Sequence, residues 1–422
     1  MDANRHSWEA IVDAGHKQSQ QAPENVDLQT LSSLLQCLES LSTAYICQTL
    51  IQLGVFIHPH ERHTLDSLME HCQIQPHYRK LLAQWLRALE EEGLVELEKN
   101  IYTNPLPLPT DSMNSLWLEA RDYASSIPQV NNFLEYLRQH GENHSRLLKG
   151  ELDPLALLFV EGSQDTAEKL YEFNPAALYF NKIIREILRA MTASQSTGKC
   201  LKILEIGAGV GATTASILPV LMSNKVLYTY TDVSSFFINQ AKRKFQNYSF
   251  VEYRKFDINL EPEPQNYQLG SFDIVIAANV LHIARDLNKA ISYLYSLLVP
   301  QGLLLLLELT HYRRSVMTTT GFVKGFSEYS DERLQDNTPL LSVEQWSEKL
   351  GTCGFEKFIA FPESGSSTDF LQQHVMIAQL PDFLTLQIAQ EETLNALSIG
   401  EGENRGKRRK EMATLRQRRK KR

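Results

Sequence analysis

The sequence predicts an α/β protein whose second half is a doubly wound, mostly parallel sheet and whose first half is mainly helical. Two observations lead to this prediction. After Gly198, strand-like apolar runs alternate with helical stretches, a pattern typical of βαβ units with helices on both faces of the sheet. The first of these runs leads directly into a glycine-rich turn, residues 205–211, and then into a helix-like stretch.

Patterning and composition divide the chain into four parts. We expect residues 1–30 to form an N-terminal arm, and residues 31–195 to form a helical lid domain with a winged-helix-like part. Residues 196–380 are expected to form the α/β core. Residues 381–422 are expected to form an extension that ends in a basic, disordered tail.

Two amphipathic helices are predicted in the first half of the chain. One apolar stripe covers residues 31–53, and a second covers residues 78–89 and ends at Gly93. A short hairpin, residues 94–102, follows the second helix and completes the outline of a winged helix. Residues 61–104 hold eight acidic and five basic residues, whereas a DNA-binding surface would be basic. The charge therefore favours a lid or packing module.

The net charge of −8 conceals an uneven distribution. Residues 405–422 carry eleven of the 42 Lys and Arg residues and one of the 50 acids, so this tail has a charge of +10 and the remainder −18. An acidic body argues against a chain-wide nucleic-acid platform. The tail lacks aromatic residues for base stacking, which argues against nucleic acid as a partner. The remaining alternatives are a solvated extension or a docking segment for an acidic partner.

Several other classes of protein are excluded by composition. No apolar run approaches the roughly 18–20 residues that span a bilayer, and the N-terminus has no apolar signal core. The five cysteines are scattered without a CxxC pair, which is typical of reduced thiols in a cytoplasmic protein. A cluster of histidines near residues 58–77 matches no zinc spacing, so it is expected to be solvated and no metal is expected.

Seven strand-like runs are expected in the core, and the first five are predicted to pair in the order 3-2-1-4-5. The runs are residues 201–206, 226–230, 251–258, 272–279, 303–307, 358–360 and 375–378.

The glycine turn after the first strand predicts a ligand site. Gly207, Gly209 and Gly211 allow a tight turn and a close approach of a ligand to the backbone above a helix N-terminus. A bare GxGxG is weak evidence because a dinucleotide site looks similar. Glu205 lies inside the turn, which suits a ligand with a cationic amino or sulfonium group better than a phosphate.

Two further acids make the site more specific. Asp232 ends the second strand, where a carboxylate can accept both hydroxyls of a ribose. Asp257 ends the third strand, where an acid can accept from the amino group of an adenine. Together with the turn, these acids favour an S-adenosylmethionine site, and the alternative is a tight βα turn with two acids that cap strand ends.

A catalytic pair is predicted at the ends of the fourth and fifth strands. These strands lie side by side in the expected order, so their carboxyl ends bring His282 and Glu308 together at the edge where ligands bind. Imidazole suits a general base near neutrality, and a carboxylate on its other nitrogen fixes the tautomer. Alternatively, His282 caps a helix and Glu308 is a solvated strand end.

These motifs resemble the C-methyltransferase domains of type I polyketide synthases and of hybrid polyketide–nonribosomal peptide synthetases. The resemblance covers about residues 30–380. The matching stretches include ILEIGAGVGATTASILPVL (203–221), FDIVIAANVLHIARDL (272–287) and LLLLLELT (303–310), and further ones at residues 152–163, 170–181, 228–245 and 339–356.

The resemblance implies a class I methyltransferase: a Rossmann-like, seven-stranded, mostly parallel sheet beneath an N-terminal helical lid. It implies that His282 is the base and Glu308 its partner, and that S-adenosyl-L-methionine is the methyl donor. It also implies closure of the lid segment that holds Tyr179 and Asn181 over the cofactor. The implied cofactor-binding residues are Glu205, Gly207, Gly209, Gly211, Asp232, Asp257, Ile258, Asn279 and Tyr179.

The sequence differs from the family pattern at two places. The usual GxGTGG turn is replaced by Gly209-Val210-Gly211-Ala212, and the Gly-Trp-Trp run after the fifth strand is replaced by Gly325-Phe326-Ser327. The second difference lies in the acyl pocket, so it leaves open O-methylation of a polyketide-type substrate with the same pair.

The expected reaction is methylation of the α-carbon of a β-ketoacyl thioester in polyketide or hybrid peptide biosynthesis. The resemblance implies that an acyl carrier protein or carrier domain presents this substrate on phosphopantetheine, and the basic tail is a candidate docking segment for it. A catalytically silent, methyltransferase-like scaffold is the alternative from another class.

Overall fold

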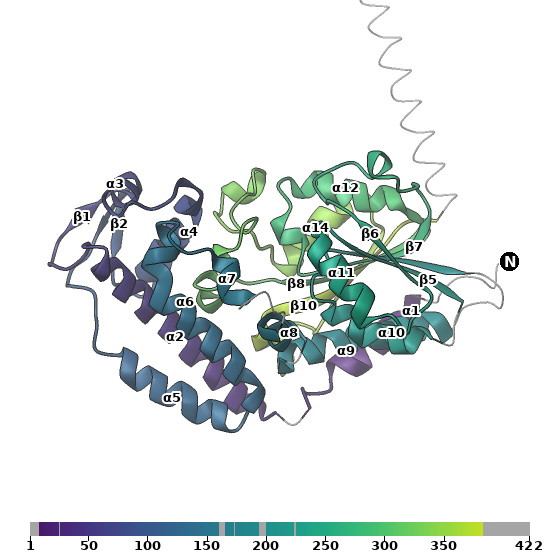
Figure 1. Ribbon diagram of the computed structural model, residues 1–422, viewed down its shortest axis with the longest axis horizontal. Helices are drawn as coiled ribbons and strands as arrows, with labels where there is room; N and C mark the ends of the chain where they lie inside the picture. The colour runs from purple at the N-terminus through teal and green to yellow at the C-terminus, as the bar shows by residue number, and fades with distance from the viewer. Residues whose placement is uncertain are drawn as a thin grey trace, which may run out of the picture.

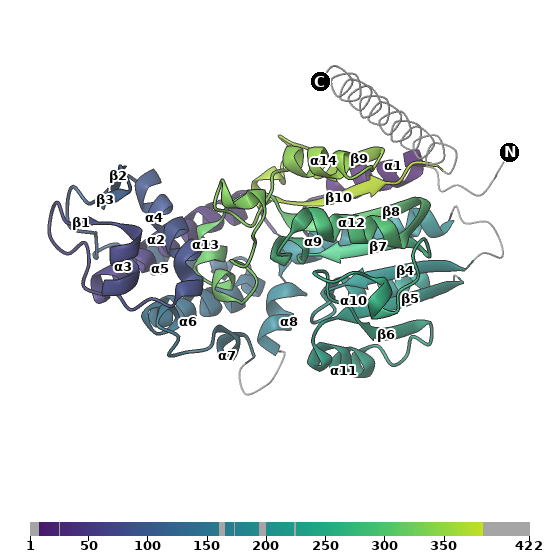
Figure 2. The same ribbon diagram turned by 90° about the horizontal axis from the view of Figure 1, so that it is seen from above.

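The computed structural model describes residues 8–24, 26–159, 165–172, 174–193, 200–222 and 225–382. Figures 1 and 2 show a helical region with a small sheet at one end and a large twisted sheet with helices on both faces at the other. The predicted tail, residues 405–422, lies outside the described residues.

The large sheet has seven strands in the order β6-β5-β4-β7-β8-β10-β9. All strands run parallel except β10, which is antiparallel to both of its neighbours. This confirms the predicted order of the first five strands and the mostly parallel sheet. The strands are β4 (Leu201–Ile206), β5 (Val226–Asp232), β6 (Val251–Lys255), β7 (Phe272–Ala278), β8 (Leu298–Leu309), β9 (Lys357–Phe361) and β10 (Gln373–Gln379).

Helices cover both faces of this sheet because successive side chains of a strand point to opposite faces and are apolar on each face. Ile203 packs into the core under one set of helices, and Leu204 into the core under the other set. The first face is covered by α1 (Trp8–Ser19), α9 (Pro175–Ala193), α10 (Ala212–Leu221) and α11 (Ser235–Lys244), and the second by α12 (Leu287–Leu297) and α14 (Val343–Thr352).

Helix α1 lies inside the stretch predicted to be an arm. It packs along α9 and against β9, and Gly15 allows the helix to contact the ring of Phe361. Helix α9 lies inside the stretch assigned to the lid, yet it packs against α10 and α1. Both helices therefore belong to the layer that covers the sheet.

The helical region contains the two predicted amphipathic helices. Helix α2 (Leu28–Gln52) ends just before Gly54, and α4 (Arg79–Glu91) ends just before Gly93, both of which adopt positive φ. The predicted hairpin is present as β2 and β3. The other elements are α3 (Leu65–His71), α5 (Met113–Ser125), α6 (Asn131–Leu148), α7 (Pro154–Leu158), α8 (Asp165–Tyr171), β1 (Arg62–His63), β2 (Glu96–Glu98) and β3 (Ile101–Thr103), with the small sheet in the order β1-β3-β2.

The segment that follows β8 joins the two regions. It begins with α13 (Arg314–Met317), which contacts α2 and α4, and Figure 2 shows it between the helical region and the large sheet. Its residues Met317, Phe322 and Phe326 pack into the same apolar core as α4. The chain that leaves the sheet beside Glu308 therefore packs into the helical region.

None of the helices in the described ranges is both long enough and apolar enough to cross a membrane.

Candidate active site

The carboxyl ends of β7 and β8 bring two distant parts of the sequence together. The strands pair in parallel with Ala278 opposite Leu307, and the amide of Asn279 donates to the carbonyl of Leu307 at 2.6 Å. Immediately beyond, a short 3-10 turn at Leu281–Ile283 carries His282 across the end of β8. Its position results from the strand order, as expected for ligand-binding edges of such sheets.

His282 and Glu308 form a direct hydrogen bond, so the structure brings the predicted pair together. Nδ1 of His282 lies 2.7 Å from Oε2 of Glu308, and the two side chains are 10% and 1% exposed. Oε1 of Glu308 accepts from the amides of Val280 at 3.0 Å and Leu281 at 2.7 Å. Because Nδ1 donates to the carboxylate, the lone pair of the neutral imidazole is on Nε2.

Phe326 and Arg333 also contact the turn that carries His282. The ring of Phe326 lies 4.9 Å from the imidazole of His282, measured between centroids. The guanidinium of Arg333 donates to the carbonyl of His282 at 3.0 Å. In the sequence, Phe326 is notable only as a departure from a family pattern. Arg333 had no sequence signal beyond a nearby acid, Asp331.

The glycine turn lies against the same loop. Gly207, Gly209 and Gly211 all have positive φ, between 57° and 74°. A Cβ atom on Gly207 would come within 2.4 Å of Val280, whereas one on Gly209 would meet no atom closer than 3.9 Å. Gly207 thus permits contact with the His282 loop, and the backbone at Gly209 is open on the side where a ligand can approach.

Asp232 supports the turn from the end of β5. Its Oδ2 accepts from the amide of Gly209 at 3.0 Å, and its Oδ1 accepts from the amide of Ser234 at 2.8 Å. Burial raises the pKa of this carboxyl, although the backbone amides of Ser234, Gly209 and Val233 act in the opposite direction. Each oxygen retains a lone pair, which suits the predicted contact with two ribose hydroxyls.

Glu205 lies below the turn and is fully buried. Its Oε2 accepts from the hydroxyl of Tyr228 at 2.6 Å and from that of Thr214. Burial raises the pKa of Glu205 to about 7. The contacts with Tyr228 and Thr214, which sequence reasoning missed, show that Glu205 braces the first turn of α10. A contact with the ligand stays a prediction.

The end of β6 meets the His282 loop from the other side. Asp257 is half-buried, and its Oδ1 accepts from the amide of Asn259 at 2.9 Å. The side chain of Asn259 in turn accepts from the amide of Arg285 at 2.8 Å. Ile258 is buried in the core beneath. Asp257 therefore lies on a loop that is tied to the loop of His282.

Two other predicted site residues are held by protein contacts. Asn279 has a positive φ of 53°, and its side-chain oxygen accepts from Gln373 at 2.9 Å. The hydroxyl of Tyr179 donates to the carbonyl of Ser19 at 2.6 Å and lies 2.8 Å from Oγ1 of Thr368, in the loop between β9 and β10. Those strands lie at the far side of the sheet from β5, so these contacts do not bring the hydroxyl of Tyr179 to the glycine turn.

Asn181 lies closer to the turn. Its side-chain oxygen accepts from Thr213, in the first turn of α10, at 2.8 Å. Of the predicted Tyr-x-Asn pair, Asn181 therefore contacts the helix that starts at the turn, and Tyr179 joins α9 to α1.

The residues present fit S-adenosylmethionine. The open backbone at Gly209 can accept the close approach of a ligand, and Asp232 can accept from its ribose hydroxyls. Within the described ranges, no group of three His, Cys, Asp or Glu side chains could hold a metal ion, and His58, His60 and His77 are exposed.

Comparisons with known proteins identify related chains. A family profile described as a methyltransferase domain matches residues 204–304. The non-reducing polyketide synthase AC of Didymella fabae is 30% identical over 325 residues, which are 75% of this chain and 12% of that protein. The highly reducing polyketide synthase pspA of Penicillium soppii is 35% identical over 215 residues, 50% of this chain and 8% of that protein. The chain thus spans about an eighth of the first polyketide synthase.

Solved structures match over most of the chain. The CurJ carbon methyltransferase has 30% sequence identity and a TM-score of 0.80, with 89% of this chain and 97% of that chain covered. The methyltransferase domain of the citrinin polyketide synthase has 24% identity and a TM-score of 0.75, with 90% and 100% covered. The chain therefore belongs to the S-adenosylmethionine-dependent carbon methyltransferases of polyketide synthases.

Proposed function

We propose that this domain methylates the α-carbon of a β-ketoacyl thioester held on a carrier, with His282 as the general base. The observation that supports this most is the 2.7 Å hydrogen bond between His282 Nδ1 and Glu308 Oε2, beside the glycine turn. The α-proton of a β-ketoacyl thioester is acidic enough for an imidazole to remove.

His282 takes the proton on Nε2. Glu308 holds the opposite nitrogen and offsets the positive charge that the imidazole gains. The amides of Val280 and Leu281 hold Glu308 in place, so the pair is oriented before the substrate arrives. The enolate that results is the nucleophile, and it needs only a methyl group placed in line.

The glycine turn places that methyl group. S-adenosylmethionine, when bound, supplies an electrophilic methyl group on a sulfonium. Asp232 and the backbone near Gly209 hold its ribose end, and the contact between Gly207 and Val280 fixes the distance from this site to His282. The ring of Phe326 lies against the imidazole and excludes water from one side of the base.

The position of the methyl group in the product tests the proposal. The purified chain is incubated with labelled S-adenosylmethionine and either a β-ketoacyl or a matched β-hydroxyacyl thioester, and the product is fragmented by mass spectrometry. We expect label on the α-carbon of the β-ketoacyl product and loss of this product in His282→Ala. Label on oxygen would instead assign O-methylation, and turnover that persists in His282→Ala would refute the role of the histidine.

Absence of turnover in the parent chain over a broad panel of thioesters would favour a silent scaffold, provided that the chain binds S-adenosylmethionine. Calorimetry with S-adenosylhomocysteine supplies that control. Cofactor binding without turnover on any acyl substrate would therefore contradict the proposed function.

The partner in this proposal is a carrier protein or carrier domain, and the basic tail, residues 405–422, is its docking segment. Deleting the tail should weaken the affinity for an acidic carrier and reduce the salt dependence of binding. Unchanged affinity would show that the tail does not dock the carrier.

All five cysteines are free thiols, which supports a cytoplasmic location.

A further inference from the structure

We infer that Arg333 is a positioning residue through which the lid fixes the backbone that carries His282. The inference rests on the proposed role of His282 and adds a residue to it. Arg333 lies in the segment between β8 and α14, in a short 3-10 turn at Glu332–Leu334. Its side chain is 3% exposed, and it points at the His282 loop rather than at solvent.

The guanidinium of Arg333 holds the carbonyl side of this loop. It donates to the carbonyl of His282 at 3.0 Å and to that of Ala284. Glu308 accepts from the amides of Val280 and Leu281 on the other side of the same turn. The backbone around the base is thus fixed from both directions, by a carboxylate on its amides and by a guanidinium on its carbonyls.

Asp331 completes the arrangement. It accepts from Nε and from Nη2 of Arg333, both at 2.8 Å, and its Oδ2 also accepts from the amide of Leu287 at 2.7 Å. Leu287 begins α12, so one buried ion pair holds the loop from His282 to the start of that helix. A lysine has a single ammonium group and cannot reproduce this planar fork.

The lid holds the segment that carries Arg333. Lys80 on α4 donates to the carbonyl of Ser327 at 2.9 Å, and its ammonium lies 3.9 Å from the ring centroid of Tyr329. One turn further along α4, Gln84 donates to the carbonyl of Asn337 at 2.9 Å. The side chain of Asn337 returns a hydrogen bond to the carbonyl of Lys80 at 3.1 Å.

A continuous set of contacts therefore links α4 to the segment at Ser327–Asn337, to Arg333 and to the carbonyl of His282. Loss of the Arg333 fork would release the loop on one side and leave Asp331 buried without its partner. A misplacement of about 1 Å at a catalytic group costs roughly 100-fold in rate. Arg333 acts through His282 and does not touch the reacting atoms.

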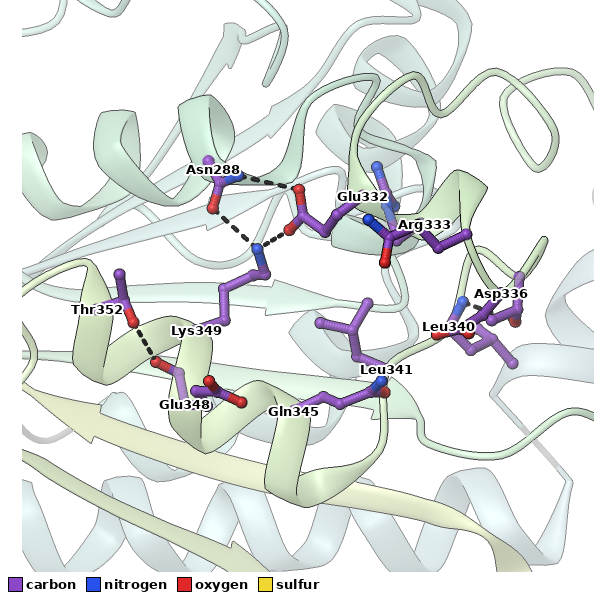
Figure 3. Close-up of a pocket in the computed structure, with 12 residues that line it drawn as sticks. Asn288, Glu332, Arg333, Asp336, Leu340, Leu341, Gln345, Glu348, Lys349 and Thr352 are labelled. Atoms are coloured by element: carbon purple, nitrogen blue, oxygen red, sulfur yellow. Dashed lines mark hydrogen bonds and ion pairs between the residues drawn. The ribbon is translucent and has the colours of Figure 1, made fainter.

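A surface cavity of about 290 Å³ lies between the 3-10 turn at Glu332–Leu334 and α14 (Figure 3). Lys349 lines this cavity and binds Asn288 and Glu332, and Arg333 lines it as well (Figure 3). This geometry supplies a matched control, because Lys349 pairs with the residue next to Arg333 but has no contact with the His282 loop. It also gives a small solute a route toward Arg333.

The experiment compares Arg333→Lys, Arg333→Ala and Lys349→Met in the full chain with a β-ketoacyl thioester. We expect Arg333→Lys to lower kcat about 10- to 100-fold, with KM and the Kd for S-adenosylhomocysteine within about twofold of the parent values. Lys349→Met should leave kcat within about twofold. Methylguanidinium in the buffer should restore part of the kcat of Arg333→Ala, and it should not affect Lys349→Met.

Unchanged kcat in Arg333→Lys, or a loss that follows the fraction of folded protein, would overturn the inference. Lys80→Met tests it from the lid side if Arg333 variants do not fold, and an unchanged kcat there would contradict the link to α4. His282→Ala is measured in parallel. If His282→Ala is inactive and Arg333→Lys keeps the parent kcat, only the inference about Arg333 is wrong. If His282→Ala stays active, the proposed function itself is wrong.

Discussion

Gly207 and Val280 interlock so closely that a Cβ atom at Gly207 would lie 2.4 Å from Cγ2 of Val280. Gly207 belongs to the turn after β4, and Val280 to the loop after β7, two residues before His282. The amide of Val280 also donates to Glu308, at the end of β8. The ends of three neighbouring strands thus meet at this contact, and the distance between the glycine turn and His282 depends on it.

Replacing Gly207 by alanine should separate the turn from the base. The new methyl group would clash with Val280, and φ of 61° is strained for a residue with a side chain. We expect the Kd for S-adenosylhomocysteine to rise at least about tenfold, a change of about 1.4 kcal/mol, with a further loss of kcat. Calorimetry and initial rates measure the two effects.

The double variant Gly207→Ala/Val280→Ala is the control, because it removes the two methyl groups of Val280 that face the turn. Only partial recovery of affinity is expected, since the strain at φ and a tight 3.0 Å approach to Cβ of Val280 remain. If the double variant binds no better than Gly207→Ala, the contact does not set the geometry of the site.

Glu308→Gln tests the carboxylate without changing its size. Glu308 accepts three hydrogen bonds, from two amides and from His282, and a glutamine amide can accept on one side only. The base then loses its orienting partner, so we expect kcat to fall by about 100- to 10,000-fold. Binding of S-adenosylhomocysteine should change by less than about threefold, and a large loss of binding would assign Glu308 to cofactor binding instead.

Two buried histidines should make the lid sensitive to acid. Burial lowers the pKa of His140 to about 4 and that of His144 to about 3, although hydrogen bonds to carbonyls raise both values. Because these folded-state pKa values lie below the unfolded value of about 6.5, their contribution to stability is present above pH 6.5. It is lost progressively as pH falls toward 4 and 3.

The free energy of unfolding of the parent chain should fall between pH 6 and 4 by about 1.4 kcal/mol per unit for each buried histidine. His144→Gln should remove one such contribution and flatten the curve, and urea titrations at several pH values measure it. The exposed His58 supplies the control, His58→Gln, which should leave the slope unchanged. Equal slopes in all three proteins would contradict burial of a neutral His144.

Gly15→Leu tests whether α1 belongs to the folded core. A Cβ at Gly15 would lie 2.4 Å from the ring of Phe361, so a leucine would push α1 off the sheet. We expect a loss of about 1–3 kcal/mol in the free energy of unfolding. Lys17→Leu, on the exposed side of the same helix, should change it by less than about 0.5 kcal/mol. A stable Gly15→Leu would mean that α1 contributes little to the core.

The large sheet could be predicted from the sequence because its signals are local. Its strands are five to twelve residues long, and most of them contain a run of apolar residues. The glycine turn is contiguous with the first strand. The meeting of His282 and Glu308 followed from strand order alone, since neighbouring parallel strands end at one edge. The register of β7 on β8, with Ala278 opposite Leu307, satisfies that expectation.

Other site features have no local signal. Glu205 looks like a ligand residue in the sequence, but Tyr228 and Thr214 reach its carboxyl only after β4, β5 and α10 have packed. Tyr179 matches a family motif, but its hydroxyl donates to the carbonyl of Ser19, which is 160 positions away in the chain. Such contacts depend on how helices dock, which a periodic pattern does not encode.

Local sequence patterns predict the class of sheet, the glycine turn, the acids at the strand ends and the two members of the proposed catalytic pair. How the helical region contacts the loop of that pair depends on tertiary packing. Lys80 and Ser327 are 247 positions apart, and Arg333 and His282 are 51 apart. Contacts between residues so far apart in the sequence arise because the segment after β8 packs between two apolar cores, and this segment has no periodic apolar pattern. For that reason the link from α4 through Arg333 to His282 became visible only in the folded chain.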